Sequence, residues 1–272
     1  MHKTETDILS GVQRRDAALI AALMITDSLF FVFARLLQPH ITPDLSVMYV
    51  MFIGAIEVGI IALVNKHLSI HTLLKNLWFF LAIGLLVSAS TYLNYTAVAF
   101  IDPGTASLLS QATLVFGLLL GLTWLREKLT LAQMGGAVLS ILGVLVITFR
   151  VGDYFRLGSL MILGSAFAYA VHAALVKKYA GQIYFYEFFF FRLLCTGGFM
   201  LVFNLSRGAI TLPVKSAWPL LLLVGTVDLT IGRSLYYLVL RRLMISTFSV
   251  LLTLSPLVTI LWSYALFGDV PG

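Results

Sequence analysis

The chain has 272 residues, of which 60% are hydrophobic and 11% charged, and its mean hydropathy is +0.99. Soluble domains carry about 25% charged residues, so this composition excludes a soluble enzyme, and its hydrophobicity excludes a disordered chain. The net charge of +6 comes from basic residues scattered in short loops, which is typical of membrane proteins and argues against a nucleic-acid partner. With Cys195 as its single cysteine, the chain has no internal disulfide and no cysteine-rich metal site.

Long stretches without Asp, Glu, Lys or Arg predict an all-α polytopic membrane protein. Each reaches the ~18–20 residues that a helix needs to cross the bilayer core. The short turn Asp102–Gly104 separates two of the spans, and Pro103 can begin the second of them at low cost. The nine predicted spans are residues 17–36, 46–64, 77–100, 104–124, 130–149, 157–177, 183–204, 217–239 and 245–267.

The basic residues predict a cytoplasmic N-terminus. With that orientation, eleven Lys and Arg residues lie in inside segments and five in outside segments, which agrees with the positive-inside rule. We therefore expect a multi-pass protein of the plasma membrane (the prokaryotic inner membrane), with membrane lipids as its surroundings. The aromatic run from Tyr184 to Phe191 is expected to form a lipid-facing belt at the interface.

An internal repeat appears when the sequence is compared with itself at a shift of 142 residues. It divides the chain into a first unit, residues 1–150 with five spans, and a second, residues 151–272 with four. A unit of five spans is odd in number, so the second copy enters the membrane inverted, an architecture common among secondary transporters. The repeat predicts a partner for span 130–149 just after Gly272. The matched pairs are Arg35 with Lys177, Tyr95 with Tyr237, Thr105 with Thr247, Ser107 with Ser249, and Glu127 with Asp269.

Two copies of one motif resemble a known family. The stretches that carry the resemblance are Tyr95–Leu109, Leu125–Thr130, Gln133, Gly136, Gly143–Leu145, Thr247–Leu252, Ser255–Pro256 and Phe267–Asp269. Together they resemble the drug/metabolite transporter superfamily, in its EamA-type ten-helix branch. The sequence departs from the pattern at Leu114, where the second copy has Pro256, and at Asp269, where Glu is usual. The resemblance implies export or exchange of small metabolites such as amino acids, vitamins or amphipathic drugs.

Ionisable residues inside spans are rare and costly, and they commonly mark functional sites. Asp27 and Asp228 lie near the middle of their spans, and Glu57 lies mid-span with helix contact as its alternative role. An isolated carboxylate there can take up and release a proton. Asp27, with no basic residue nearby on its own helix, is therefore the expected proton carrier. Arg233 either faces Asp27 across a cavity, binds a substrate carboxylate, or extends to the interface.

Polar residues at helical spacing form stripes on five of the spans. Such stripes either line a hydrated cavity or bond neighbouring helices, and their recurrence at repeat-related positions favours the cavity. The predicted substrate-binding residues are Asp27, Ser88, Thr91, Tyr95, Ser107, Gln111, Tyr169, His172, Asp228, Arg233, Tyr237, Ser249 and Thr253.

These features favour a secondary transporter that moves a small amino-acid-like or amphipathic solute by alternating access, in the efflux direction. An integral-membrane enzyme is less favoured, because the sequence has no His-Glu-x-x-His motif, paired histidines or phosphate-binding loop. The remaining alternative is a non-catalytic lipid-handling or assembly subunit. We expect no cofactor and no metal, and a homodimer is possible.

Overall fold

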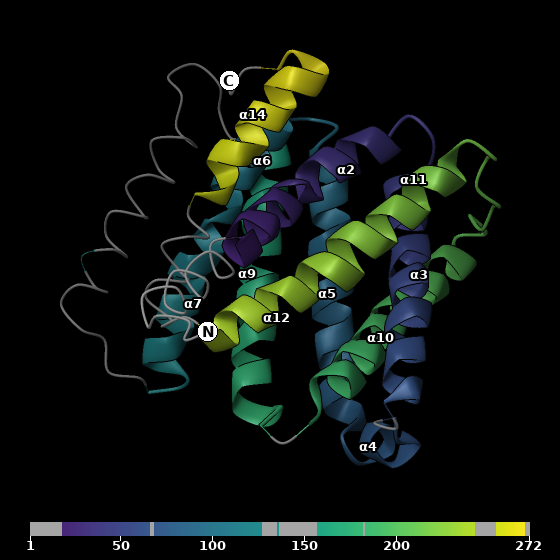
Figure 1. The fold of residues 1–272 in the computed structure, drawn as a ribbon, viewed down its shortest axis with the longest axis vertical. Helices are drawn as coiled ribbons and strands as arrows, with labels where there is room; N and C mark the ends of the chain where they lie inside the picture. Colours follow the sequence, from purple (N-terminus) through teal and green to yellow (C-terminus); the bar gives the residue numbers. More distant parts are fainter. Residues whose placement is uncertain are drawn as a thin grey trace, which may run out of the picture.

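The computed structural model describes residues 18–65, 68–126, 135, 157–181, 183–242 and 254–269, and within this part its regular elements are helices (Figure 1). Seven helices are long and apolar enough to cross a membrane. They span Ala18–Leu37, Pro43–Val64, Leu77–Ala97, Pro103–Thr123, Leu157–Tyr179, Phe185–Ser206 and Ala217–Tyr236, close to the predicted bounds. A shorter apolar helix, Ser255–Phe267, covers part of the predicted ninth span, and span 130–149 lies outside the described residues.

Several spans consist of more than one element. The first ends in α2 (Phe30–Leu37), and the fourth is divided into α6 (Pro103–Ser110) and α7 (Ala112–Thr123). The eighth runs through α11 (Ala217–Val224), the π-helix η1 (Gly225–Gly232) and α12 (Arg233–Arg242). The other elements are α3 (Pro43–Val64), α4 (Ile70–Lys75), α5 (Leu77–Ala97), α9 (Leu157–Tyr179), α10 (Phe185–Ser206) and α14 (Ser255–Phe267).

The start of α6 follows from its sequence, as predicted. Pro103 occupies the first turn, where its missing N–H is not needed. The Asp102 carboxylate caps this turn, accepting from the Thr105 backbone N–H at 2.8 Å and from the Thr105 hydroxyl at 2.6 Å. The cap fixes the sharp turn between α5 and α6.

The packing of the helices follows the inverted repeat. Several of the larger helix contacts map onto one another when each span of the first half is exchanged with its counterpart in the second. The corresponding pairs α3 with α10, and α6 with α14, pack on each other. The contact of α5 with α9 has its counterpart where Leu23 of the first span meets Val239 of α12, and the contact of α5 with α10 has its counterpart in α3 with η1. In Figure 1, α14 lies along α6, and α11, η1 and α12 cross the bundle as one diagonal helix.

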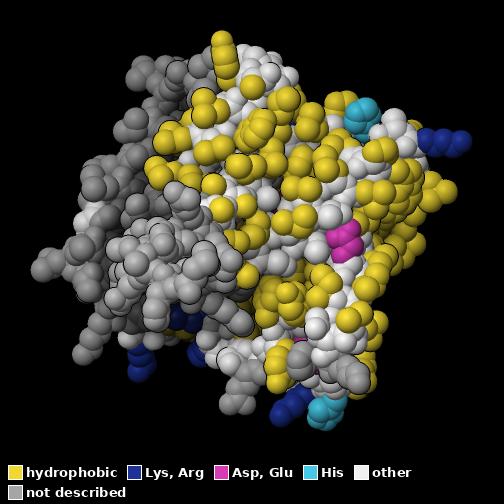
Figure 2. All heavy atoms as spheres, viewed as in Figure 1, with side chains coloured by type: hydrophobic (Ala, Val, Ile, Leu, Met, Phe, Trp, Pro, Cys, Tyr) yellow, Lys and Arg dark blue, Asp and Glu magenta, His cyan; other side chains and the backbone are white. Residues whose placement is uncertain are grey.

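The outer surface suits a lipid environment. Large apolar side chains are exposed along the spans, among them Ile56, Leu85 and Leu261. In Figure 2, hydrophobic side chains cover most of the described part of the visible face, and Lys and Arg lie at its margins. Because a bilayer offers no hydrogen bonds, the backbone beneath such a surface must be satisfied internally, as it is in a helix.

The expectation of a lipid-facing belt over the aromatic run 184–191 is wrong for its buried members, whereas Tyr184 is 60% exposed. Phe188, Phe189 and Phe191 are at most 5% exposed, and Phe188 and Phe191 pack against the buried rings of Phe79 and Phe80 on α5. In a bilayer the protein interior and the lipid are equally apolar, so composition alone does not tell which of them a Phe faces.

Candidate functional site

A central cavity of about 230 Å³ lies between the two halves of the chain. Every described span contributes to its wall, and Asp27 lies midway along the first span. Its polar lining residues are Asp27, Ser90, Thr91, Asn94, Ser107, Ser110, Gln111, Thr113, Ser165, Tyr169, Arg192, Arg233, Tyr236 and Ser255, and its apolar ones are Phe30, Phe31, Met51, Leu114, Ala166 and Leu229. A polar wall of this kind, enclosed by apolar helices, can hold a hydrated polar solute inside a membrane.

Several lining residues of the cavity are related by the 142-residue repeat. Four pairs of lining residues differ by this number: Asp27 with Tyr169, Thr91 with Arg233, Asn94 with Tyr236, and Thr113 with Ser255. The same positions of both copies therefore face the same space, which places the cavity on the pseudo-symmetry axis. This is where transporters with inverted repeats bind their substrates.

Asp27 joins three helices at the cavity. Its carboxylate accepts a hydrogen bond from the Ser255 hydroxyl of α14 at 2.8 Å and lies 3.9 Å from the Arg233 guanidinium of α12. The arginine therefore faces Asp27 across the cavity, which was one of the predicted alternatives. Asp27 is therefore not a lone carboxylate, because its charge partner comes from a distant part of the chain. A proton-carrier role can no longer be argued from isolation.

Helix irregularities concentrate around this cavity. The first span is interrupted at Leu29, the fourth at Gln111 between α6 and α7, and the eighth by η1. Next to the first of these, the Ser28 carbonyl accepts a hydrogen bond from Thr259 of α14 at 3.0 Å. Irregular backbone at membrane depth is tolerated where it lines a cavity, and such discontinuous helices are common at transporter binding sites.

Glu57 of α3 forms hydrogen bonds with the neighbouring π-helix η1. Its carboxylate oxygens accept from the Thr226 and Thr230 hydroxyls, each at 2.6 Å. Close approach of α3 and η1 depends on Gly225, where a Cβ would come within 2.5 Å of Ile53. The wider π-helical turn brings residues five apart together, so Asp228 and Arg233 are closer around the axis than an α-helix would place them. Glu57 thus makes the helix contact that was its predicted alternative role.

Arg192 of α10 is a buried guanidinium at the cavity wall. It is 5% exposed and stands 5.7 Å from the Phe189 ring, and its Nε has no hydrogen-bond partner in the described part of the structure. Leaving such a buried donor unpaired costs about 1–3 kcal/mol. The sequence signal was present, since an arginine inside a span is rare, but the polar stripes did not include it.

Of the predicted substrate-binding residues, the structure brings six together at the cavity: Asp27, Thr91, Ser107, Gln111, Tyr169 and Arg233. Four others are buried but do not line it: Ser88, Tyr95, His172 and Asp228. Ser249, Thr253 and the side chain of Tyr237 lie outside the described part.

On α5 the cavity-facing side differs from the predicted one. The stripe Ser88, Thr91 and Tyr95 is turned partly away, and Ser90, Thr91 and Asn94 line the cavity instead. Ser88 bonds the Leu85 carbonyl of its own helix at 2.8 Å. Ser90 bonds Ser165 of α9 across the wall at 2.8 Å.

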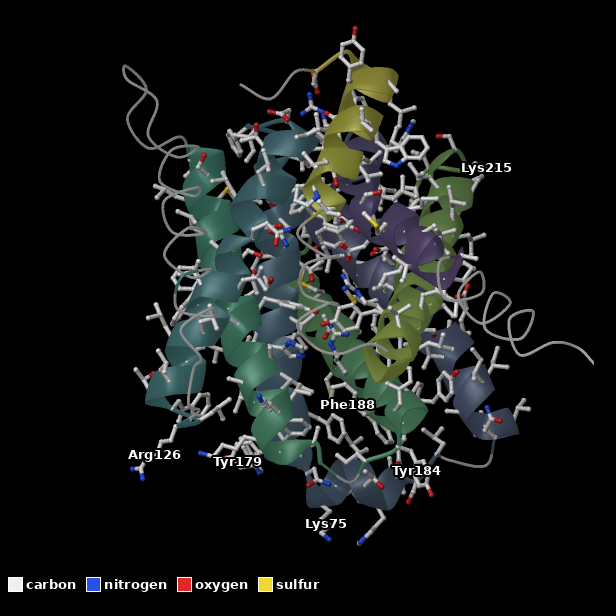
Figure 3. The ribbon with its side chains drawn as sticks, turned by 60° about the vertical axis from the view of Figure 1, so that its left-hand side comes forward. Lys75, Arg126, Tyr179, Tyr184, Phe188 and Lys215 are labelled. Carbon is white, nitrogen blue, oxygen red and sulfur yellow. The ribbon has the colours of Figure 1, made fainter. Side chains whose placement is uncertain are left out.

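A second, more open hollow of about 700 Å³ lies at one end of the bundle. Its lining includes Ser69, Lys75, Tyr179, Tyr184 and Glu187, and the Ser69 N–H donates to Glu187 at 2.9 Å. Figure 3 shows Lys75, Tyr179 and Tyr184 together at that end, with Arg126, and Lys215 at the other. Although larger, this hollow lies at helix ends and connecting loops, and none of its lining residues are paired by the 142-residue repeat. The central cavity is therefore the candidate transport site.

Comparison with known proteins identifies the family. A profile of the EamA-like transporter family matches residues 16–149 and again residues 156–272. The chain belongs to the EamA-like transporter family, a drug/metabolite type of transporter, and both copies of the repeat carry the family pattern.

Among solved structures, one described only as "Crystal structure of protein" is similar, with a TM-score of 0.69 and 17% sequence identity. The similarity covers 95% of this chain and 90% of that chain, and at this identity it shows the fold alone. No curated protein matches the chain significantly.

Proposed function

We propose that the protein is a secondary transporter that carries a small amino-acid-like solute out of the cell by alternating access. The observation that carries this proposal is the central cavity, whose wall combines Asp27, Arg192 and Arg233. A carboxylate and guanidiniums facing one space are complementary to a solute that has both an ammonium and a carboxylate group. The sequence has no phosphate-binding loop, so gradients supply the energy.

The size of the cavity supports a small solute. Sites for drug-sized ligands span about 300–1,000 Å³, and this cavity measures about 230 Å³. Its apolar lining, with Phe30, Met51 and Leu229, suits a hydrocarbon side chain beside the charged groups. An amino acid of moderate size fits both requirements.

Counterflow in proteoliposomes tests this function. Vesicles containing the purified protein are loaded with one unlabelled amino acid at a time and diluted into the labelled compound. A transporter accumulates label transiently, and Arg233→Gln should abolish that accumulation because it removes a cavity charge. A wild-type protein that shows no counterflow with any amino acid would refute the proposal and favour a lipid-handling or assembly role.

Orientation is tested separately by cysteine labelling. The native Cys195 is half-buried within α10 and is replaced by alanine to give a background without thiols. On this background, Lys215→Cys should react with an impermeant maleimide in intact cells, and Lys75→Cys only after permeabilisation, since the two residues lie at opposite ends (Figure 3). The reverse result would overturn the cytoplasmic N-terminus.

A further inference from the structure

The charges that line the cavity do not cancel. In the described part of the wall they are Asp27, Arg192 and Arg233, one carboxylate against two guanidiniums. Asp27 lies 3.9 Å from Arg233, so these two compensate each other. The wall therefore keeps an excess positive charge, and it belongs to Arg192.

The other buried acid nearby does not compensate Arg192. Asp228 is 3% exposed, does not line the cavity, and forms no salt bridge with Arg192 in the described residues. Glu187, five residues earlier on α10, accepts from Ser69 at the end of the bundle. Arg192 thus combines a burial of more than nine-tenths with a position on the cavity wall and an Nε that has no partner in the described residues.

The position of Arg192 has no charged counterpart in the other half of the chain. The repeat counterpart of Arg192 is Val50, a buried apolar residue of α3. The two halves of the cavity therefore differ in charge at this position, as they also do where Asp27 corresponds to Tyr169 and Arg233 to Thr91. A solute with two unlike ends can then bind in one orientation only.

We propose that Arg192 is the carboxylate-binding residue of the cavity. The cavity then takes an α-amino acid whose ammonium group points toward Asp27. This rests on the proposed function and names the group that fixes the substrate class. A guanidinium presents Nε and a terminal nitrogen as a fork that matches the two oxygens of a carboxylate. A bound carboxylate supplies the partner that Nε lacks and pairs with the charge of Arg192. A monoamine without a carboxylate gives Nε no partner and leaves the charge of Arg192 unpaired.

Ligand binding to the detergent-purified full chain tests this assignment independently of transport. Thermal-shift titrations with the twenty amino acids identify the tightest ligand, and its amide, which keeps the ammonium but lacks the negative charge, is then titrated. Wild type should prefer the acid over the amide roughly 10- to 100-fold, the range expected for a hydrogen-bonded charge pair.

Three variants separate binding from folding. Arg192→Met should bind acid and amide equally, and Arg192→Lys should keep an intermediate preference because it retains the charge without the fork. Arg207→Met is the matched control, since Arg207 pairs with Asp44 at 3.8 Å on the surface and does not line the cavity; it should keep the wild-type preference. If Arg192→Met is not monodisperse on size exclusion, the acid preference of Arg192→Lys tests the assignment instead.

The outcomes distinguish the inference from the proposed function. An Arg192-dependent preference without counterflow supports the inference and refutes transport. Counterflow of amino acids with an unchanged acid preference in Arg192→Met and Arg192→Lys supports transport and overturns the inference. Binding of no amino acid, or equal binding of acid and amide by wild type, also overturns it.

Discussion

The pairing of Asp27 with Arg233 can be measured by a double-mutant cycle. The cycle uses Asp27→Asn, Arg233→Gln and the double variant. Asn retains an oxygen that can accept the Ser255 hydrogen bond, which is 2.8 Å long in the wild type. The change at Asp27 therefore removes the charge with little loss of volume or hydrogen bonding.

The structure sets the size of the expected coupling. Two unit charges 3.9 Å apart attract by about 4 kcal/mol at an effective dielectric constant of about 20. The side chains of Arg233 and Asp27 are 20% and 27% exposed, so water in the cavity screens them. Interhelical polar interactions in membrane proteins contribute about 0.6 kcal/mol on average and about 1.7 at most. We expect a coupling of about 1–1.5 kcal/mol in the free energy of unfolding.

Unfolding in mixed detergent micelles with increasing dodecyl sulfate gives the four free energies. Each single variant should be less stable than wild type, and the double variant should be more stable than the sum of the two losses predicts. Independent sites add to within about 0.3–0.5 kcal/mol. Additivity within that margin would show that the two residues do not act as a pair, and the charge argument built on Arg192 would lose its basis.

Three further predictions concern the structure around the cavity, each read out by the same unfolding assay. Glu57→Leu should destabilise by about 1–3 kcal/mol, because it removes both hydrogen bonds to η1; a loss no larger than for Glu57→Gln would contradict the two-bond contact. Asp102→Ala should cost about 1 kcal/mol through loss of the cap on Thr105, and Asp102→Asn should restore most of it. Gly84→Val should cost about 1–3 kcal/mol or more, since even a Cβ would lie 2.7 Å from the Cys195 Cβ; wild-type stability would show that α5 and α10 are not so close.

The sequence alone determined the number and approximate bounds of most spans and the internal repeat. Hydrophobic length depends on local composition, and a helix that crosses a bilayer needs no distant partner to satisfy its backbone. The rare charges inside spans were visible for the same reason, because the bilayer makes them costly wherever they occur. Asp27 and Arg233 could therefore be named as site residues before their distance was known.

Only the tertiary structure decided which side of each helix faces the cavity. A water-soluble helix shows its buried side by its hydrophobic periodicity, but a membrane helix meets apolar surroundings on both its lipid and its protein sides. Sequence reasoning therefore selected Ser88 and Tyr95 where Ser90 and Asn94 line the cavity, and it placed the aromatic run of α10 in lipid. The π-helix η1 likewise depends on contacts with α3 that are remote in sequence. So does the position of Arg192, whose counterpart in the first half is a valine and whose surroundings arise only when the two inverted halves pack together.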